Sequence, residues 1–201
     1  MKKTFHEAIK HRRSYYALSN ASPISDEAIQ EILYAVSTYT PSAFNSQSTR
    51  MVLLLGDAHK KLWDIVKETL RKKTSAETFV NTEKKIDSCF LSGYGTVLFF
   101  EDETIIKDLQ SRFPLYKDNF PIWSHHTNAM HQFNVWTMLE DAGFGASLQH
   151  YNPLIDEEVK ATWNLPAHWQ LVAQMPFGTP LEESTEKQYL PIEEKVFVIN
   201  K

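Results

Sequence analysis

The chain has little of what several specialised protein classes depend on. Its one cysteine, Cys89, excludes an internal disulfide framework and points to a reducing compartment. No segment approaches the roughly 18 consecutive apolar residues of a membrane span, and the N-terminal lysines precede no apolar stretch of the kind found in secretory signals. The net charge of −4 comes without a basic patch, which argues against a nucleic-acid partner. We therefore expect a cytoplasmic protein with neither membrane nor nucleic-acid partners.

The composition is that of a folded globular chain. Hydrophobic residues make up 42% and charged residues 23% of the 201 positions, a balance that separates the chain from disordered sequences. This length supports one well-buried core and is short for two ordinary domains, so we expect a single domain over residues 1–201. Aromatic residues account for 12%, which suits a large core, an interface or a pocket for an aromatic ligand.

Hydrophobic periodicity predicts a mixture of helices and strands. The helix at 4–13 begins with a capping box of Thr4 and Glu7, and the helix at 25–36 begins at Ser25. Further helices are expected at 57–70, 75–87, 105–112, 124–142 and 156–163. Short apolar runs predict strands at 51–55, 96–100, 169–177 and 195–199, with a strand or extended loop at 146–151 and an acidic turn at 101–103. The pattern indicates an α+β fold around one sheet.

The helix predicted at 124–142 has the strongest pattern in the chain and ends at Gly143. Its apolar residues, among them Phe133, Trp136 and Leu139, spread over much of its circumference. One small sheet cannot cover so wide a surface. The helix is therefore expected to lie at the centre of the fold or to be covered by a second copy of the chain.

Several familiar catalytic and metal-binding patterns are missing. The pair Gly93 and Gly95 precedes a strand, whereas a dinucleotide-binding glycine motif follows one, so a tight turn is the better interpretation. His125, His126 and His131 lack the i, i+4 spacing that places two imidazoles on one helical face, and we predict no metal site. No nucleophile elbow or phosphate-binding loop of the Walker type occurs.

Three segments have a composition suited to ligand binding. Arg12, Arg13 and Ser14 end the first helix, and paired guanidinium donors suit a phosphate, although a solvated helix end explains the same residues. The loop at 41–48 gathers neutral donors and acceptors that suit the edge of a heterocycle, or an ordinary polar turn. The segment at 143–151 follows the long helix with glycines, which let the backbone approach a flat ligand closely.

The order and spacing of these motifs resemble the FMN-dependent nitroreductase family. The shared elements are H-R-R-S at 11–14, P-S-x-x-N-S-Q at 41–47, G-x-G-A-S-L-Q-H-Y at 143–151 and K-x-Y-L-P-I-E-E at 187–194. The stretch S-G-Y-G-T-V-L-F-F-E-D at 92–102 is similar to the short, fatty-acid-repression-type subgroup. The likeness runs over essentially the whole chain. It implies a nitroreductase-like α+β fold, with a central, mostly antiparallel sheet flanked by helices, in an intertwined homodimer.

The resemblance also implies which residues contact the flavin. In chain order they are Arg12, Arg13, Ser14, Tyr16, Ser42, Asn45, Gln47, Asn81, Lys84, Leu148, Gln149, His150, Lys187 and Tyr189. The first three and Lys187 would hold the phosphate and ribityl chain, whereas the loop at 41–48 would reach the flavin of the partner subunit. Because Lys85 is adjacent to Lys84, either lysine could be the one that contacts the flavin. Tyr16 and Tyr189 stand where the family has basic residues, so the charge near the flavin must come from elsewhere.

By resemblance, the chain is expected to be an oxidoreductase that moves electrons from NADH or NADPH through FMN to nitroaromatics, quinones or similar small aromatic acceptors. The reaction would be ping-pong and carried by the flavin, so no side chain is named as catalytic. Phe44 and the segment 113–123 are expected to line the pocket over the ring. The alternatives are a flavin-binding regulatory or sensing protein with little turnover, and a helical interaction protein without flavin.

Overall fold

The centre of the fold is an antiparallel sheet whose strands follow the order β1-β5-β3-β2, with β4 paired to β5. The computed structural model describes residues 3–184 and 186–200. The strands are β1 (Leu18–Ser19), β2 (Thr49–Leu55), β3 (Gly95–Asp102), β4 (Gly145–Ala146) and β5 (Trp169–Pro180). The helices are α1 (Phe5–His11), α2 (Asp26–Tyr39), α3 (Gly56–Arg71), α4 (Ala76–Ile86), α5 (Glu103–Arg112), α6 (Asn119–Asp141) and α7 (Asp156–Thr162).

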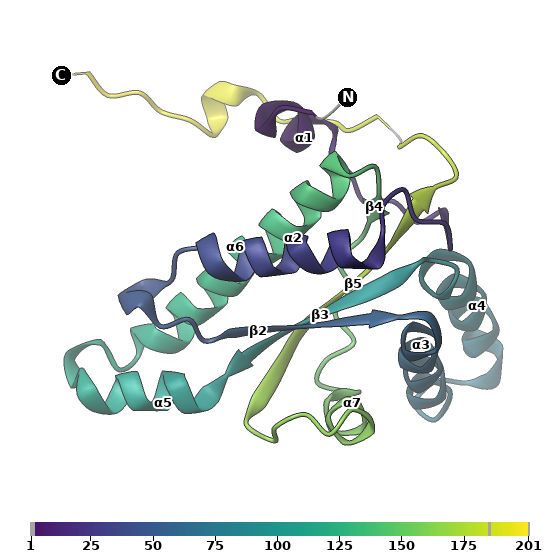
Figure 1. The fold of residues 1–201 in the computed structure, drawn as a ribbon, viewed down its shortest axis with the longest axis horizontal. Helices are drawn as coiled ribbons and strands as arrows, with labels where there is room; N and C mark the ends of the chain where they lie inside the picture. The colour runs from purple at the N-terminus through teal and green to yellow at the C-terminus, as the bar shows by residue number, and fades with distance from the viewer. Residues whose placement is uncertain (1–2, 185, 201) are drawn as a thin grey trace.

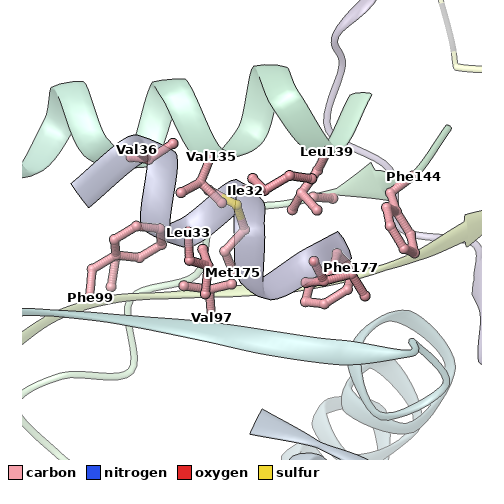
Figure 2. Close-up of a cluster of buried hydrophobic side chains, with 13 residues drawn as sticks. Ile32, Leu33, Val36, Val97, Phe99, Val135, Leu139, Phe144, Met175 and Phe177 are labelled. Atoms are coloured by element: carbon pink, nitrogen blue, oxygen red, sulfur yellow. The ribbon is translucent and has the colours of Figure 1, made fainter. Parts of the chain in front are cut away.

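The strand β3 is buried along its whole length because helices cover both faces of the sheet (Figure 1). Side chains alternate between the faces of a strand. Val97 and Phe99 therefore join the core under α2 and α6, while Leu98 and Phe100 join the core under α3 and α7. Figure 2 shows the first of these cores, with the side chains of α2 and α6 packed on those of β3 and β5. The continuous apolar run in the sequence follows from this two-sided burial.

Most predicted elements are present with shifted ends. The capping box of Thr4 and Glu7 begins α1, and the Ser25 side chain caps α2, as the sequence predicts. The start predicted for the long helix is wrong, because α6 begins at Asn119 and the Ser124 hydroxyl donates to the Pro121 carbonyl inside the helix. The acidic turn predicted at 101–103 is also wrong, since Glu101 and Asp102 are the buried final residues of β3.

The strand predicted at 195–199 is wrong for the chain described. A strand needs a neighbour to accept its backbone hydrogen bonds, and none lies beside this segment in the described part of the chain. From 186 to 200 the structure contains one short turn, Ile192–Glu194, and the segment runs past α1 and away from the sheet (Figure 1). Its apolar side chains, including Phe197, Val198 and Ile199, are exposed.

Among the residues at 3–184 and 186–200, no helix has the length and hydropathy required to cross a membrane.

Candidate functional site

Two distant parts of the sequence meet at the end of α1. The helix ends at His11 with Arg12 as its C-cap, and Nη2 of Arg13 donates a hydrogen bond of 3.0 Å to the Tyr189 hydroxyl. The Lys187 ammonium lies 5.5 Å from the centre of the same phenol ring. A guanidinium and an ammonium therefore flank one tyrosine, and a phosphate group prefers this kind of surroundings. Arg13 and Lys187, two of the residues predicted for the phosphate, therefore lie beside one tyrosine on the surface.

Arg12 adds a third cation to this group. Its guanidinium carbon stacks 4.4 Å from the ring centre of Trp136 on α6. Burial, followed by the charge of Arg13, lowers the pKa of Arg12, although Glu140 acts in the opposite direction. The buried Arg12 Nε finds no hydrogen-bond partner among the described residues, and a buried donor left in this way is costly unless a ligand satisfies it. The orphaned donor is therefore a second sign of a bound polar group.

The segment after Arg13 runs beside the segment that follows α6. Ser14 and Ala146 form a parallel bridge, and the Tyr15 amide donates to the Ala146 carbonyl at 3.0 Å. A Cβ at Gly145 would lie 2.7 Å from the Tyr15 ring, so this glycine allows the two segments to pack closely. The glycine predicted to admit a flat ligand thus admits a neighbouring segment of the chain.

Leu148, Gln149 and His150, which the resemblance places against the flavin ring, come shortly after Ala146 in the chain. Gln149 pairs with Gln174 of β5, Leu148 packs against the core, and His150 is exposed. Tyr16 is 45% exposed, with its ring 6.4 Å from that of Phe90. Tyr16, which stands where the family has a basic residue, is therefore accessible at the surface.

Asn81 and Lys84 lie exposed on α4, and no contact within residues 3–184 and 186–200 places either of them at the cation group. The neighbouring Lys85 has its ammonium 6.0 Å from the Phe90 ring, which also neighbours Tyr16. The sequence does not decide between Lys84 and Lys85. Of the two, Lys85 lies near Phe90, which also neighbours Tyr16. The role of either lysine toward a flavin stays a prediction.

The loop at 41–48 has an unusual backbone. Phe44, Asn45 and Gln47 have φ angles of 56°, 51° and 48°, in the left-handed region that favours glycine. Each such residue costs about 1–3 kcal/mol, with asparagine at the low end, and persists only where the surroundings enforce it. Inside the loop, the Gln47 amide donates to the Ser42 hydroxyl at 3.0 Å. Strain of this kind gathers at binding sites, which agrees with the polar role predicted for this loop.

Aromatic side chains surround Phe44 on one side of this loop. Its ring is 49% exposed and has neighbouring ring centres at 5.0–6.1 Å. The neighbours come from the segment predicted to line a pocket with it, and are Phe113, Tyr116, Phe120 and Trp123. Phe44 and this segment therefore form one aromatic surface, and its place over a flavin ring stays a prediction.

The sequence does not predict the buried polar network that lies beneath the loop. The Glu101 side chain is 0% exposed and accepts hydrogen bonds from the hydroxyls of Ser48 and Thr49, both at 2.6 Å. It also accepts one from the Asn128 amide at 2.8 Å, and Asn128 accepts one from Gln132 at 2.7 Å. The signal available in the sequence was two hydroxyl residues at the start of one strand and an acid at the end of its neighbour.

Two groups of the predicted site residues lie at opposite ends of α6. The group at Arg13 and Lys187 lies near Trp136, whereas the loop at 41–48 contacts Phe120 and Trp123 through Phe44. Trp123 and Trp136 are 13 residues apart in the helix, which at a rise of about 1.5 Å per residue is about 20 Å. The two groups therefore lie at different levels along α6 within one chain.

A model of the nitroreductase family matches residues 9–179. The chain belongs to this family. It is 35% identical to the nitroreductase FRM2 of Saccharomyces cerevisiae over 185 residues, which are 91% of each chain. It also superimposes with a TM-score of 0.88 on the nitroreductase CinD from Lactococcus lactis, at 40% identity, covering 98% of this chain and 100% of the other. A nitroreductase structure from Saccharomyces cerevisiae, 34% identical, gives a TM-score of 0.75 over 88% of this chain and 96% of the other.

These similarities confirm the family resemblance seen in the sequence and the α+β fold with an antiparallel sheet. Membership of the nitroreductase family makes this chain an oxidoreductase. The CinD structures contain chloramphenicol or 4-nitrophenol, both small aromatic molecules.

Proposed function

We propose that this nitroreductase binds FMN and transfers electrons from NADH or NADPH to small aromatic electrophiles such as nitroaromatics and quinones. The observation that carries the proposal is the group of Arg12, Arg13, Lys187 and Tyr189. It brings three cations together at one place, and one of them has a buried donor without a partner in the described chain. A dianionic phosphate at the end of a flavin satisfies both features.

The residues present fit the cofactor as a set. Arg13 and Lys187 would hold the phosphate, with the Arg12 donor and the Ser14 hydroxyl turned to the phosphate and ribityl chain. Bound FMN would supply the hydride chemistry, with the nicotinamide and the acceptor using one pocket in turn. The protein's part is to bind, to orient and to exclude water, and no side chain is required as an acid or base. A chain of the same fold from Desulfovibrio desulfuricans, 18% identical with a TM-score of 0.70, is described in complex with FMN.

We propose that the enzyme is a homodimer in which the loop at 41–48 of one subunit completes the flavin site of the other. The family resemblance of the P-S-x-x-N-S-Q motif at 41–47 supports this arrangement, since in that family the partner subunit supplies this loop. The exposed side of α6 supports it too, because Met130, Phe133 and Met138 are 37–39% exposed on a helix that should bury such residues.

The C-terminal segment fits the same dimer. Strand β2 is at the edge of the sheet, and an edge strand presents backbone groups that can pair with another chain. The segment at 195–199 has the composition of a strand but no strand partner in the described part of its own chain. Placed across a dimer interface, its exposed apolar side chains would be covered. The strand predicted from the sequence would then form only in the assembly.

The aromatic surface at Phe44 supports flat acceptors as substrates. In the dimer it would stand over the ring of the partner subunit's flavin, where stacked aromatic side chains favour planar molecules. The relative CinD has been solved with 4-nitrophenol and with chloramphenicol, which are molecules of this class. Phe44 and Trp123 are the residues expected to contact such an acceptor.

The flavin content and the turnover of the purified protein distinguish this proposal from its alternatives. We expect a yellow preparation with about one non-covalent FMN per chain, identified by chromatography after heat release. With NADH or NADPH and a nitroaromatic acceptor, the protein should consume the nicotinamide catalytically. Tight FMN binding with negligible turnover would favour the regulatory flavoprotein instead. A folded, colourless protein that does not take up added FMN would refute the proposal.

A further inference from the structure

The loop at 41–48 cannot hold its own conformation. Three of its residues, Phe44, Asn45 and Gln47, have positive φ angles, and none of them is glycine. The hydrogen bonds inside the loop are few, namely Gln47 to the Ser42 hydroxyl and two short backbone turns at Ser42 and Ala43. A strained segment persists only where neighbouring structure fixes its ends. Residues outside the loop must therefore fix its ends.

The first fixation is the buried carboxylate of Glu101. In the register of the sheet, Thr49 lies opposite Glu101 in the antiparallel pair of β2 and β3. The carboxylate accepts from the hydroxyls of Ser48 and Thr49, the two residues at which the loop enters β2, and from Asn128 of α6. All four residues are buried. One side chain thus joins the end of the loop to a sheet strand and to the long helix.

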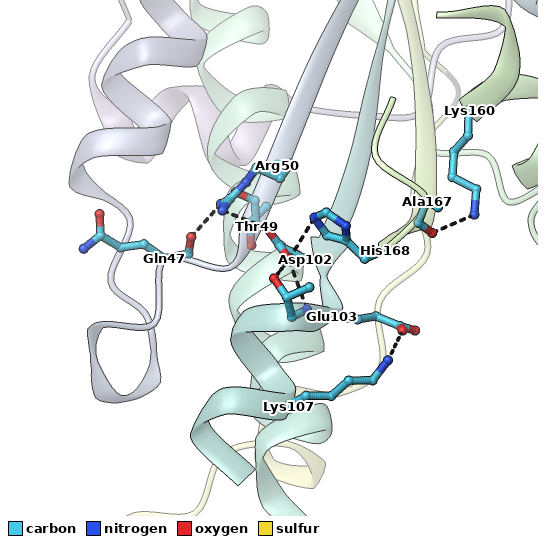
Figure 3. Close-up of polar contacts among 10 residues, drawn as sticks. Gln47, Thr49, Arg50, Asp102, Glu103, Lys107, Lys160, Ala167 and His168 are labelled. Atoms are coloured by element: carbon cyan, nitrogen blue, oxygen red, sulfur yellow. Dashed lines mark hydrogen bonds and ion pairs between the residues drawn. The ribbon is translucent and has the colours of Figure 1, made fainter. Parts of the chain in front are cut away.

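The second fixation is the ion pair next to it. Nη1 of Arg50 donates to the Gln47 carbonyl at 2.7 Å, and Nη2 donates to the Asp102 carboxylate at 3.1 Å (Figure 3). The Asp102 amide donates to the Ser48 carbonyl at 2.9 Å. Burial alone would raise the pKa of Asp102, but hydrogen bonds from Thr104 and the charge of Arg50 outweigh it, and the pKa is lowered. Asp102 therefore stays ionised and holds Arg50 against the strained residue Gln47.

We infer that Glu101 is a positioning residue for the flavin site: with Asp102 and Arg50 it holds the loop at 41–48 in the shape that meets the edge of the flavin ring. This rests on the proposed function. It also gives a role to the acidic end of the 92–102 stretch, which the flavin contacts do not use. Glu101 itself is fully buried, so it acts through Ser48 and Thr49 without touching the flavin.

The test removes the hydroxyls. Removing Glu101 outright would strand three buried donors and destabilise the whole fold. The double variant Ser48→Ala with Thr49→Val removes both hydrogen bonds between the loop and the carboxylate and leaves the one from Asn128, so urea unfolding of each variant measures how much of any effect is global. Thr49→Ser keeps the hydroxyl and is the conservative partner. The control is Thr96→Val, which removes a buried hydroxyl bonded to Trp63 and His59 near the other end of β3.

The first measurement is hydrogen exchange of the flavin-free protein, followed by mass spectrometry for the peptide covering 42–47. We expect exchange in this peptide about tenfold faster in the double variant, since about 1.4 kcal/mol of lost fixation is a factor of ten. Thr49→Ser and Thr96→Val should exchange there as the wild type does. Wild-type exchange in the double variant would overturn the inference. So would equal acceleration by Thr96→Val, because the effect would then be general loss of stability.

The second measurement compares FMN with riboflavin. Because the loop meets the ring, the double variant should bind both ligands about tenfold more weakly, with their affinity ratio unchanged. Wild-type affinity for both ligands in a double variant whose loop exchanges fast would also overturn the inference, since the loop shape would not matter to the ring. A wild-type protein that binds neither ligand refutes the proposed function, and the exchange experiment still decides whether the network holds the loop.

Discussion

Lys187→Ala and Arg13→Ala are expected to weaken FMN binding while leaving riboflavin binding nearly unchanged. The two cations flank the Tyr189 ring, with Arg13 bonded to its hydroxyl at 3.0 Å and Lys187 at 5.5 Å from its centre. Both cations therefore lie beside one side chain, and we expect them to contact the phosphate together. Riboflavin lacks the phosphate, so its affinity depends on the ring and ribityl contacts alone. The two ligands therefore separate a phosphate contact from any other effect.

The magnitude follows from the kind of hydrogen bond lost. A hydrogen bond to a charged group contributes about 1.5–3 kcal/mol, which corresponds to a loss of roughly 10- to 150-fold in FMN affinity for each variant. Tyr189→Phe removes only a neutral hydroxyl and should cost less. Arg12→Ala is a less clean variant, because Arg12 also packs on Trp136 and its removal would disturb that contact.

The assay is titration of flavin-free protein with each ligand, followed by the change in flavin fluorescence. Lys60→Ala on α3 removes an exposed positive charge elsewhere and is the control for net charge. Melting temperatures of the flavin-free variants check that the fold is intact. Equal losses for FMN and riboflavin would refute the reasoning, because these residues would then support the fold and not the phosphate.

Three further predictions follow. Truncation after Tyr189 removes the exposed apolar segment and should convert a two-chain particle into monomers, as measured by light scattering; a truncated protein that stays dimeric would contradict the proposed role of the segment. Phe44→Ala should raise the KM for a nitroaromatic by about 3- to 10-fold, the range of one aromatic contact, and an unchanged KM would remove Phe44 from the pocket. Burial lowers the pKa of His59 and of His131, so below the unfolded pKa of about 6.5 the unfolded chain binds protons that the folded chain does not. The free energy of unfolding should therefore fall with acidification, by up to about 1.4 kcal/mol per pH unit for each histidine, and urea titrations of wild type and His59→Gln between pH 7 and 5.5 should show a smaller slope in the variant.

The fold could be predicted where local sequence and tertiary packing agree. The run from Thr96 to Phe100 was assigned correctly because a strand covered on both faces needs apolar residues at every position. Thr4 was assigned correctly because a capping box depends only on residues three apart. The start of α6 was assigned wrongly because Ser124 resembles a cap, while the helix continues upstream to Asn119, where Phe120 packs with Trp123 and Ile106.

The candidate site could be predicted only as a set of motifs. Sequence order placed Arg13 and Lys187 in separate motifs, and the structure brings them to one tyrosine. Glu101 is not recognisable in the sequence because an acid followed directly by two other acids resembles an exposed turn. Only the register of β2 against β3 shows that it faces Thr49 in the interior. Buried polar partners of this kind depend on pairing between distant segments, so the hydroxyl residues at one strand and the acid at another do not show by themselves that they meet.

The arrangement along α6 bears on how a complete site is built. The helix carries Asn128 near one group and Trp136 near the other, so its length sets the distance between the loop at 41–48 and the cations at Arg13. If two copies complete each other's sites as proposed, each α6 holds the loop of one site and the phosphate group of the other. Both the loop and the cation group are fixed to this helix. Asn128 donates a hydrogen bond to Glu101 beneath the loop, and Arg12 stacks on Trp136. Because the helix is rigid, it keeps the loop at 41–48 and the cations at Arg13 at a fixed distance from each other. The strained loop can then stay in its binding shape before the flavin arrives, which lowers the entropy cost of binding.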